Sequence, residues 1–224
     1  MNKKIFYSVT TLVGLGIIYF TINKFFGKKS VGKTANNILF VGDSITAIEY
    51  NGQPVKTNYP YLIKQKLEPQ GRKVDVLAVS GKTTGWQLSN LIEKFKNNNY
   101  DRIYIYGGIN DIFSGIPQEE ALSNLQQMVD LSNQNGADPY VIIGYDAQSF
   151  MDENKLKPTA DVPTKAGMIE LKNNYVDYQN SIPNTITGAT IVDKFDIPSS
   201  MNSDGIHPTP SGQAIIAEKL LENI

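Results

Sequence analysis

The chain from Asn36 onward alternates short apolar runs with segments of helical periodicity, and this alternation constrains the fold more than any other feature. The apolar runs are residues 37–42, 73–81, 102–108, 139–146 and 189–195, and the helical segments are 59–68, 85–98, 118–133, 168–178 and 209–224. Strands that alternate with helices of this length indicate right-handed crossovers and a parallel sheet. The sequence therefore predicts a three-layer α/β/α domain with a flavodoxin-like, five-stranded parallel sheet.

Polar clusters follow several of these predicted strands. Gly42-Asp43-Ser44 ends the first strand, Ser80-Gly81 the second and Gly107 to Asp111 the third, while Asp204 to His207 follows the fifth strand and precedes the last helix. In open parallel sheets the functional groups gather at the carboxyl ends of the strands. We therefore expect these four clusters to meet at one edge of the sheet.

Composition excludes several classes of function. At 224 residues, with 41% hydrophobic and 19% charged residues, the chain suits one globular domain. A net charge of −1 leaves no basic footprint, so we expect no nucleic-acid partner. The absence of cysteine excludes disulfides, thiolate metal sites and a cysteine nucleophile, and the single histidine, His207, argues against an imidazole metal site. We expect neither metal nor cofactor, and His207 is the one imidazole available as a base at neutral pH.

The four clusters resemble the sequence blocks of the SGNH (GDSL) hydrolase family, and the resemblance extends over nearly the whole of the predicted domain. The matching stretches are Val41 to Thr46, which contains Gly-Asp-Ser, then Ala78 to Thr84 with Gly81, then Gly108-Ile109-Asn110-Asp111, and finally Asp204-Gly205-Ile206-His207. Two positions depart from the usual pattern, because Ile45 replaces the commoner leucine and Lys82 stands where an acidic residue often follows the glycine. The resemblance implies a serine hydrolase with the fold predicted above.

The chemistry of these residue types agrees with that implication. A serine hydroxyl becomes a good nucleophile when a base takes its proton, and imidazole suits this task at neutral pH. His207 would act on Ser44, and Asp204, three residues before it, would orient the ring and stabilise the imidazolium. The resemblance further implies an oxyanion hole made of the Ser44 and Gly81 backbone N–H groups and the Asn110 side chain. Taken singly, each cluster could instead be an ordinary turn or helix cap.

The predicted activity is cleavage of an acyl ester through an acyl-enzyme. The family's substrates include lipid esters, thioesters and acetylated carbohydrates, and the motifs do not choose among them. An acyltransferase on the same fold, or a non-catalytic module that retains it, are the alternatives. The irregular stretch from Asp146 to Lys165 is a candidate rim or lid, in which Phe150 and Met151 could meet an acyl chain, or an ordinary surface loop.

The first 35 residues form a separate region. Residues 5–22 contain no charged side chain. A run of this length is about the minimum for a membrane-spanning helix. We expect an uncleaved signal anchor followed by a polar tether in residues 1–35, with the catalytic domain in residues 36–224. A cleaved signal peptide, giving a secreted enzyme, and a soluble helix are the alternatives. Lysines flank the run on both sides, and those at positions 3 and 4 favour an exported, extracytoplasmic domain.

Overall fold

The computed structural model describes residues 35–159 and 162–224. Its main sheet contains five parallel strands in the order β4-β1-β5-β6-β7. The strands are β1 (Asn37–Gly42), β4 (Lys73–Ala78), β5 (Arg102–Ile105), β6 (Asp138–Ile142) and β7 (Thr190–Val192). The chain order across the sheet is therefore 2-1-3-4-5, which is the flavodoxin-like order. The predicted five-stranded parallel sheet is confirmed.

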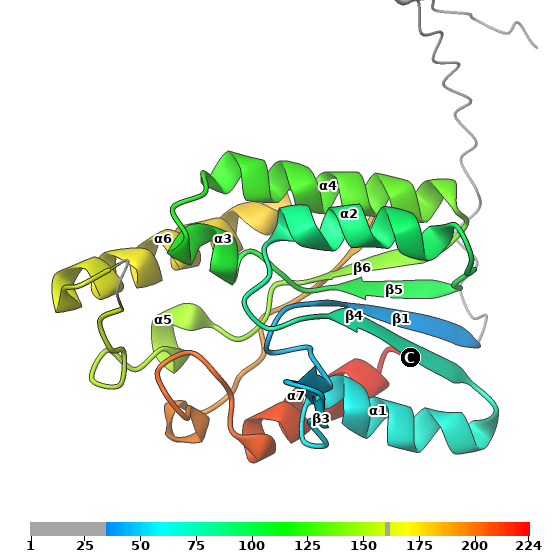
Figure 1. The fold of residues 1–224 in the computed structure, drawn as a ribbon, viewed down its shortest axis with the longest axis horizontal. Coiled ribbons are helices and arrows are strands. Elements are labelled where there is room, and N and C mark those ends of the chain that lie inside the picture. The colour runs from blue at the N-terminus through cyan, green and yellow to red at the C-terminus, as the bar shows by residue number, and fades with distance from the viewer. Residues whose placement is uncertain (1–34, 160–161) are drawn as a thin grey trace, which may run out of the picture. The chain divides into compact units, whose positions relative to one another are not determined.

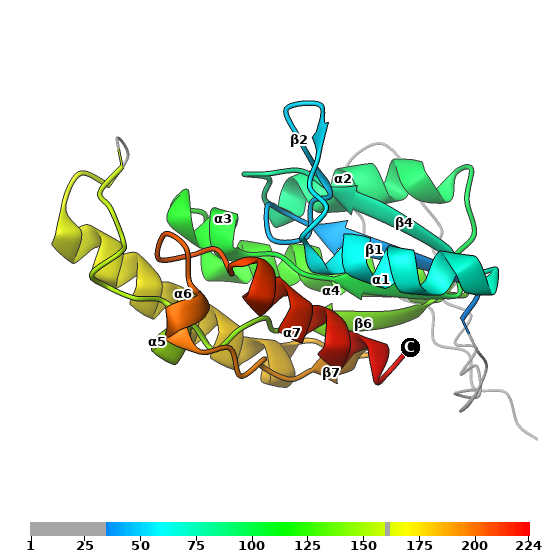
Figure 2. The same ribbon diagram turned by 90° about the horizontal axis from the view of Figure 1, so that it is seen from below.

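Helices cover both faces of this sheet and complete the three layers. Figures 1 and 2 place α1 and α7 on one face and α2, α4 and α6 on the other. The helices are α1 (Tyr59–Leu67), α2 (Thr84–Phe95), α3 (Ile109–Phe113), α4 (Gln118–Gln134), α5 (Ala147–Phe150), α6 (Lys165–Thr185) and α7 (Pro210–Leu221), with 3-10 turns η1 (Glu68–Gln70) and η2 (Ser199–Met201). Since α1 and α2 lie on opposite faces, the winding direction changes between β1 and β5. In sheets of this kind, ligands bind at such a switch point.

The core is built on β1, whose side chains from Ile38 to Val41 are fully buried. A strand covered by helices on both faces reads as a continuous apolar run, because neither face meets water. Phe40 stacks on Tyr104 of β5 with ring centroids 5.1 Å apart and meets the edge of Tyr59 of α1 at 5.6 Å. These aromatic contacts fix the central strands and hold α1 against the sheet.

Several short elements were not predicted. A hairpin of β2 (Glu49–Tyr50) and β3 (Gln53–Pro54) turns at Asn51-Gly52, where both residues have positive φ angles. An Asn-Gly pair is a strong hairpin signal that accepts such angles, so this element was detectable in the sequence. Helix α3 begins inside the Gly-x-Asn-Asp block, and α5 lies within the stretch that we expected to be irregular.

The suggestion that Phe150 and Met151 meet an acyl chain is wrong. Both side chains are buried in the core, and the ring of Phe150 lies 4.2 Å from that of Tyr145. Their apolar character therefore serves packing, and the segment around α5 is a structural part of the domain.

The predicted membrane anchor, residues 5–22, lies outside the described residues, and the domain boundary after residue 35 stays a prediction. Among the helices of residues 35–159 and 162–224, none combines the length and the apolar character needed to cross a bilayer.

Candidate active site

Ser44 lies in a tight turn directly after β1. The backbone N–H groups of Thr46 and Ala47 donate to the Asp43 carbonyl, and the Asp43 carboxylate accepts the N–H of Ile45 at 3.0 Å. Thr46 folds back against Gly42, where a Cβ atom would come within 2.2 Å of its hydroxyl oxygen. Glycine at position 42 is therefore required for the close approach that turns the chain and presents Ser44 at the end of the strand.

Two side chains that the sequence analysis did not identify hold this turn from outside. The Asn58 amide donates to the carbonyls of Ser44 and Ala47, at 3.1 and 2.7 Å. Gln213 of α7 is buried, donates to the Ile45 carbonyl at 3.1 Å and accepts the N–H of Tyr59 at 3.0 Å. Gln213 thus joins α7, α1 and the turn, and the detectable signal was a polar residue on the buried face of the last helix.

Ser44, His207 and Asp204 meet in one hydrogen-bonded row. The Ser44 hydroxyl oxygen lies 2.8 Å from Nε2 of His207, and Nδ1 of the same ring lies 2.8 Å from an Asp204 carboxylate oxygen. Ser44 comes from the loop after β1 and the other two residues from the loop before α7. This loop ends where Thr209 caps α7 and Pro210 begins it. The structure therefore brings together the three side chains that the motifs placed far apart in the chain.

The second carboxylate oxygen of Asp204 fixes the backbone of its own loop. It accepts the N–H groups of Ile206 and His207 at 3.0 and 2.9 Å. Partial burial alone would raise the pKa of Asp204, but hydrogen bonds from the backbone and ring of His207 and from the Ile206 N–H together lower it. Asp204 therefore remains a carboxylate, able to accept a hydrogen bond from the Nδ1–H, even in mildly acidic solution.

Asp43, beside the serine, has the opposite electrostatic environment. It is fully buried, and its second carboxylate oxygen has no hydrogen-bond partner among the described residues. Burial raises the pKa of Asp43 to about 6, against the lowering effects of the Ile45 N–H and the nearby His207. Its role in the turn is to accept the backbone N–H of Ile45.

Gly81, in the loop after β4, lies close to Asn110, which is in α3 after β5. Gly81 has a φ of +76°, which favours glycine, and no described atom lies within 4 Å of the position of an added Cβ. The Asn110 amide donates to the Lys82 carbonyl at 3.1 Å and so ties the loop after β4 to α3. Because an amide has two N–H donors, the second remains for another acceptor. The ammonium of Lys82 lies 6.0 Å from the centre of the Trp86 ring.

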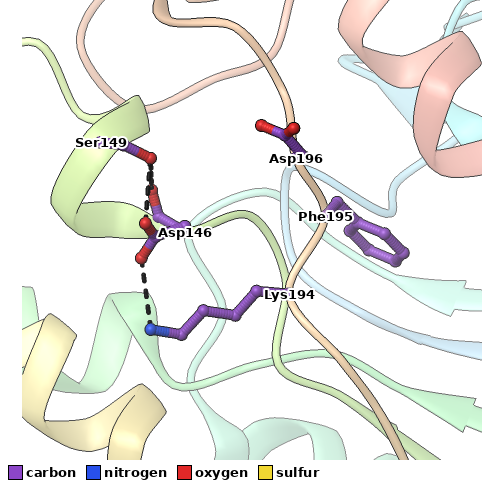
Figure 3. A pocket seen from close by; sticks show the side chains of 5 residues that line it. All are labelled: Asp146, Ser149, Lys194, Phe195 and Asp196. Atoms are coloured by element: carbon purple, nitrogen blue, oxygen red, sulfur yellow. Dashed lines mark hydrogen bonds and ion pairs between the residues drawn. The ribbon is translucent and has the colours of Figure 1, made fainter.

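A separate hollow of about 320 Å³ lies beyond β6 and β7. Figure 3 shows its lining residues, in which Lys194 pairs with Asp146 at 3.2 Å and the Ser149 hydroxyl donates to the same carboxylate at 3.0 Å. None of the five predicted site residues lines it. Across residues 35–159 and 162–224, no cluster of three or more histidine, aspartate or glutamate side chains is arranged to hold a metal ion.

Comparison with known proteins agrees with this geometry. The profile of the GDSL-like Lipase/Acylhydrolase family matches residues 40–215. The chain belongs to this family. The resemblance seen in the motifs is thereby confirmed, and with it the prediction of a carboxylic-ester hydrolase.

Individual members of the GDSL-like family extend the comparison. An arylesterase from Vibrio mimicus is 26% identical over 202 residues, which cover 89% of this chain and 94% of the relative. The psychrotrophic esterase EstA from Pseudoalteromonas sp. superposes with a TM-score of 0.59 at 20% identity, over 84% of this chain and 95% of its own. A catalytic mutant of an acetylxylan esterase from Geobacillus stearothermophilus gives a TM-score of 0.59 at 18% identity, over 83% and 92% of the two chains. At these identities the solved structures support the fold.

Proposed function

We propose that this family member cleaves acyl esters through a covalent acyl-enzyme on Ser44. The observation that carries the proposal is the row from Ser44 through His207 to Asp204, with both hydrogen-bond distances at 2.8 Å. A nucleophile within hydrogen-bond reach of a base, which a third group orients, is the arrangement that this chemistry needs.

In the first step the Ser44 oxygen attacks the ester carbonyl while Nε2 of His207 takes the hydroxyl proton. Asp204 holds the Nδ1–H and stabilises the imidazolium that forms. When the tetrahedral intermediate collapses, His207 returns the proton to the departing alcohol and the acyl group stays on Ser44. Water, deprotonated by the same ring, then attacks the acyl-enzyme, releases the acid and restores Ser44.

The negative charge of the intermediate would be met by three donors. In the described part of the chain, the backbone N–H groups of Ser44 and Gly81 donate to no other residue and so are available to substrate. The free N–H of the Asn110 amide is the third donor, and its partner hydrogen bond to Lys82 orients it. Donors held in place before the reaction stabilise developing charge without having to reorganise.

Which acyl group and which alcohol the substrate carries can be tested directly. The Vibrio mimicus relative is named an arylesterase and one structural neighbour an acetylxylan esterase. Aryl acetates combine the two chemistries, so p-nitrophenyl acetate is the first substrate to try. Activity that falls from acetate to longer p-nitrophenyl esters indicates an acetyl esterase, whereas a rise indicates a lipid substrate.

The proposal is tested by covalent labelling with a fluorophosphonate probe. Wild-type protein should be labelled and should lose activity in proportion, whereas Ser44→Ala should not be labelled. Ser114→Ala is the matched control, because Ser114 is an exposed serine after α3, and this variant should label like wild type. Equal labelling of wild type and Ser44→Ala would refute the assignment of the nucleophile.

We further propose that residues 5–22 anchor the enzyme in a membrane with the catalytic domain exported. The uncharged run of that segment supports this. Full-length protein should sediment with membranes and resist carbonate extraction, while a chain that starts at Asn36 should stay in the supernatant and keep its activity. A mature protein with a new N-terminus near Gly32 would show instead that the segment is a cleaved signal.

A further inference from the structure

The loop that carries Asp204 and His207 is joined to the segment around α5 through one buried side chain. Asn202 is 3% exposed and its amide donates to the Phe150 carbonyl at 2.9 Å. Its side-chain oxygen accepts the N–H of Gly205, one residue after Asp204. Both functional ends of the amide are therefore used, one on each side of the contact between the two segments.

Further contacts close the catalytic loop on itself and against the same neighbour. The backbone N–H and the hydroxyl of Ser203 both donate to the His207 carbonyl at 2.9 Å, so the loop forms a small ring. Lys155 donates to the Asn202 carbonyl at 2.8 Å. Gly205 has a φ of +102°, and a Cβ there would come within 2.9 Å of Leu156. The catalytic loop thus packs directly on residues 150–156.

That neighbouring segment is itself fixed to the rest of the domain. Lys194, which follows β7, pairs with Asp146 at the start of α5, as Figure 3 shows. The buried Lys172 of α6 pairs with Glu153 at 3.1 Å, and Lys165 donates to the Leu156 carbonyl at 2.9 Å. Figures 1 and 2 both show α5 beside the loop that precedes α7. Because the segment around α5 is held in place, Asn202 can hold the loop that carries Asp204 and His207 in position against it.

We propose that Asn202 is a positioning residue for catalysis, which holds Asp204 and His207 in line with Ser44 by joining the Phe150 carbonyl to the Gly205 N–H. This inference rests on the function proposed above. The side chains of Asp204 and His207 are 54% and 39% exposed, so their geometry depends on hydrogen bonds and on the position of the loop backbone more than on packing around them. A displacement of about 1 Å at such a group lowers a rate by roughly 100-fold.

The test compares Asn202→Ala with wild type on p-nitrophenyl acetate. We expect kcat to fall by about 10- to 100-fold while KM changes by less than about threefold, because Asn202 acts on geometry and does not touch substrate. Asn135→Ala is the matched control, since the Asn135 amide also donates to a backbone carbonyl, that of Leu131, but does so at the far end of α4. The control should keep its kcat within about twofold.

A second measurement reports on the catalytic loop itself. His207 is the one histidine of the chain, so its ring proton bound to Nδ1 gives a single resonance in ¹⁵N-labelled protein. In wild type the hydrogen bond to Asp204 should shift this proton downfield and protect it from exchange with water. In Asn202→Ala the resonance should move upfield or broaden, an effect that a purely structural role elsewhere in the domain would not produce.

The outcomes separate this inference from the proposed function. If Asn202→Ala folds and keeps both the wild-type kcat and the wild-type Nδ1 proton resonance, the inference is wrong, even when Ser44→Ala has shown that Ser44 is the nucleophile. If Asn202→Ala does not fold, Asn202→Asp decides, because it keeps the shape and the acceptor for Gly205 but loses the donor to Phe150. Asn202→Asp should lower kcat by at least about threefold, and an unchanged kcat would overturn the inference.

Discussion

The Asp111 carboxylate is bound to the first residue of α2, because Thr84 donates to it through its backbone N–H at 2.9 Å and also through its hydroxyl. The carboxylate is fully buried and comes from α3, the short helix after β5. A negative charge at a helix N-terminus satisfies free N–H groups and interacts favourably with the helix dipole. Asp111 therefore joins α2 to α3, and its neighbour Asn110 is left for the proposed oxyanion hole.

We predict that Asp111→Asn acts mainly on stability. The variant keeps an acceptor for the Thr84 N–H but loses the charge, and its amide places a donor against the Thr84 hydroxyl. The free energy of unfolding should fall by about 2 kcal/mol, as measured by urea denaturation. Its kcat on p-nitrophenyl acetate should stay within about fivefold of wild type at a temperature where the variant is folded.

Asn110→Ala should act mainly on kcat rather than on stability. It removes a donor to the oxyanion and also frees the Lys82 carbonyl, next to Gly81, from its partner. We expect kcat to fall by about 10²–10³-fold with little change in KM, because the lost interaction strengthens only in the transition state. Asn110→Asp should be at least as damaging, since a carboxylate is acceptor-only and would repel both the oxyanion and the Lys82 carbonyl. A near-normal kcat in Asn110→Ala, with a larger loss in Asp111→Asn, would remove Asn110 from the oxyanion hole.

The sequence was sufficient to predict the sheet, and its motifs named three side chains, those of Ser44, His207 and Asp204, that the fold brings into hydrogen-bond contact. A strand buried on both faces must be apolar throughout, so β1 was visible as an unbroken run from Ile38 to Val41, and the short motifs mark where such strands end. The carboxyl ends of parallel strands share one edge, and this brings Ser44 and His207 within hydrogen-bond distance although 163 residues separate them.

The supporting side chains could not be predicted in the same way. Gln213, Asn58 and Asn202 act through hydrogen bonds to backbone groups, and any backbone carbonyl offers the same acceptor. No pattern in the sequence shows which carbonyl a side chain will reach. Phe150 and Met151 were misinterpreted for a related reason, because nothing in the sequence shows that these apolar side chains face inward and pack in the core.

Asp204 and His207 should behave as one unit in mutant kinetics. Asp204→Asn should lower kcat less than His207→Ala, because the Asp204 side chain is half exposed and water can replace part of its effect. The double variant should be no slower than His207→Ala alone, since Asp204 acts only through the imidazole. The measurement is kcat and kcat/KM for the four proteins at pH 8. Losses that multiply in the double variant would contradict the triad.

The raised pKa of Asp43 predicts an unusual dependence of stability on pH. Burial raises its pKa in the folded protein to about 6, from an ordinary value of 3.8 in the unfolded chain. Between these two values the folded state holds a proton that the unfolded state has lost. Because stability falls with rising pH wherever the folded state binds more protons, Asp43 favours folding below pH 4 and loses that contribution as the pH rises to 6. The difference of about two pKa units corresponds to about 3 kcal/mol at neutral pH.

Asp43→Asn isolates this effect, because asparagine has nearly the same shape, keeps an acceptor for the Ile45 N–H and carries no charge. Asp204 has a lowered pKa and so works in the opposite direction, but it is present in both proteins and cancels when they are compared. The free energy of unfolding of each protein is measured with urea at pH 4.5 and pH 7.5. The difference between variant and wild type should be about 2 kcal/mol more in favour of the variant at pH 7.5 than at pH 4.5. Asp130→Asn, on the exposed face of α4, is the control and should show no such change. If the stabilities of Asp43→Asn and wild type differ by the same amount at both pH values, Asp43 is ionised in the folded protein throughout this range, and water or a partner must then satisfy its buried carboxylate oxygen.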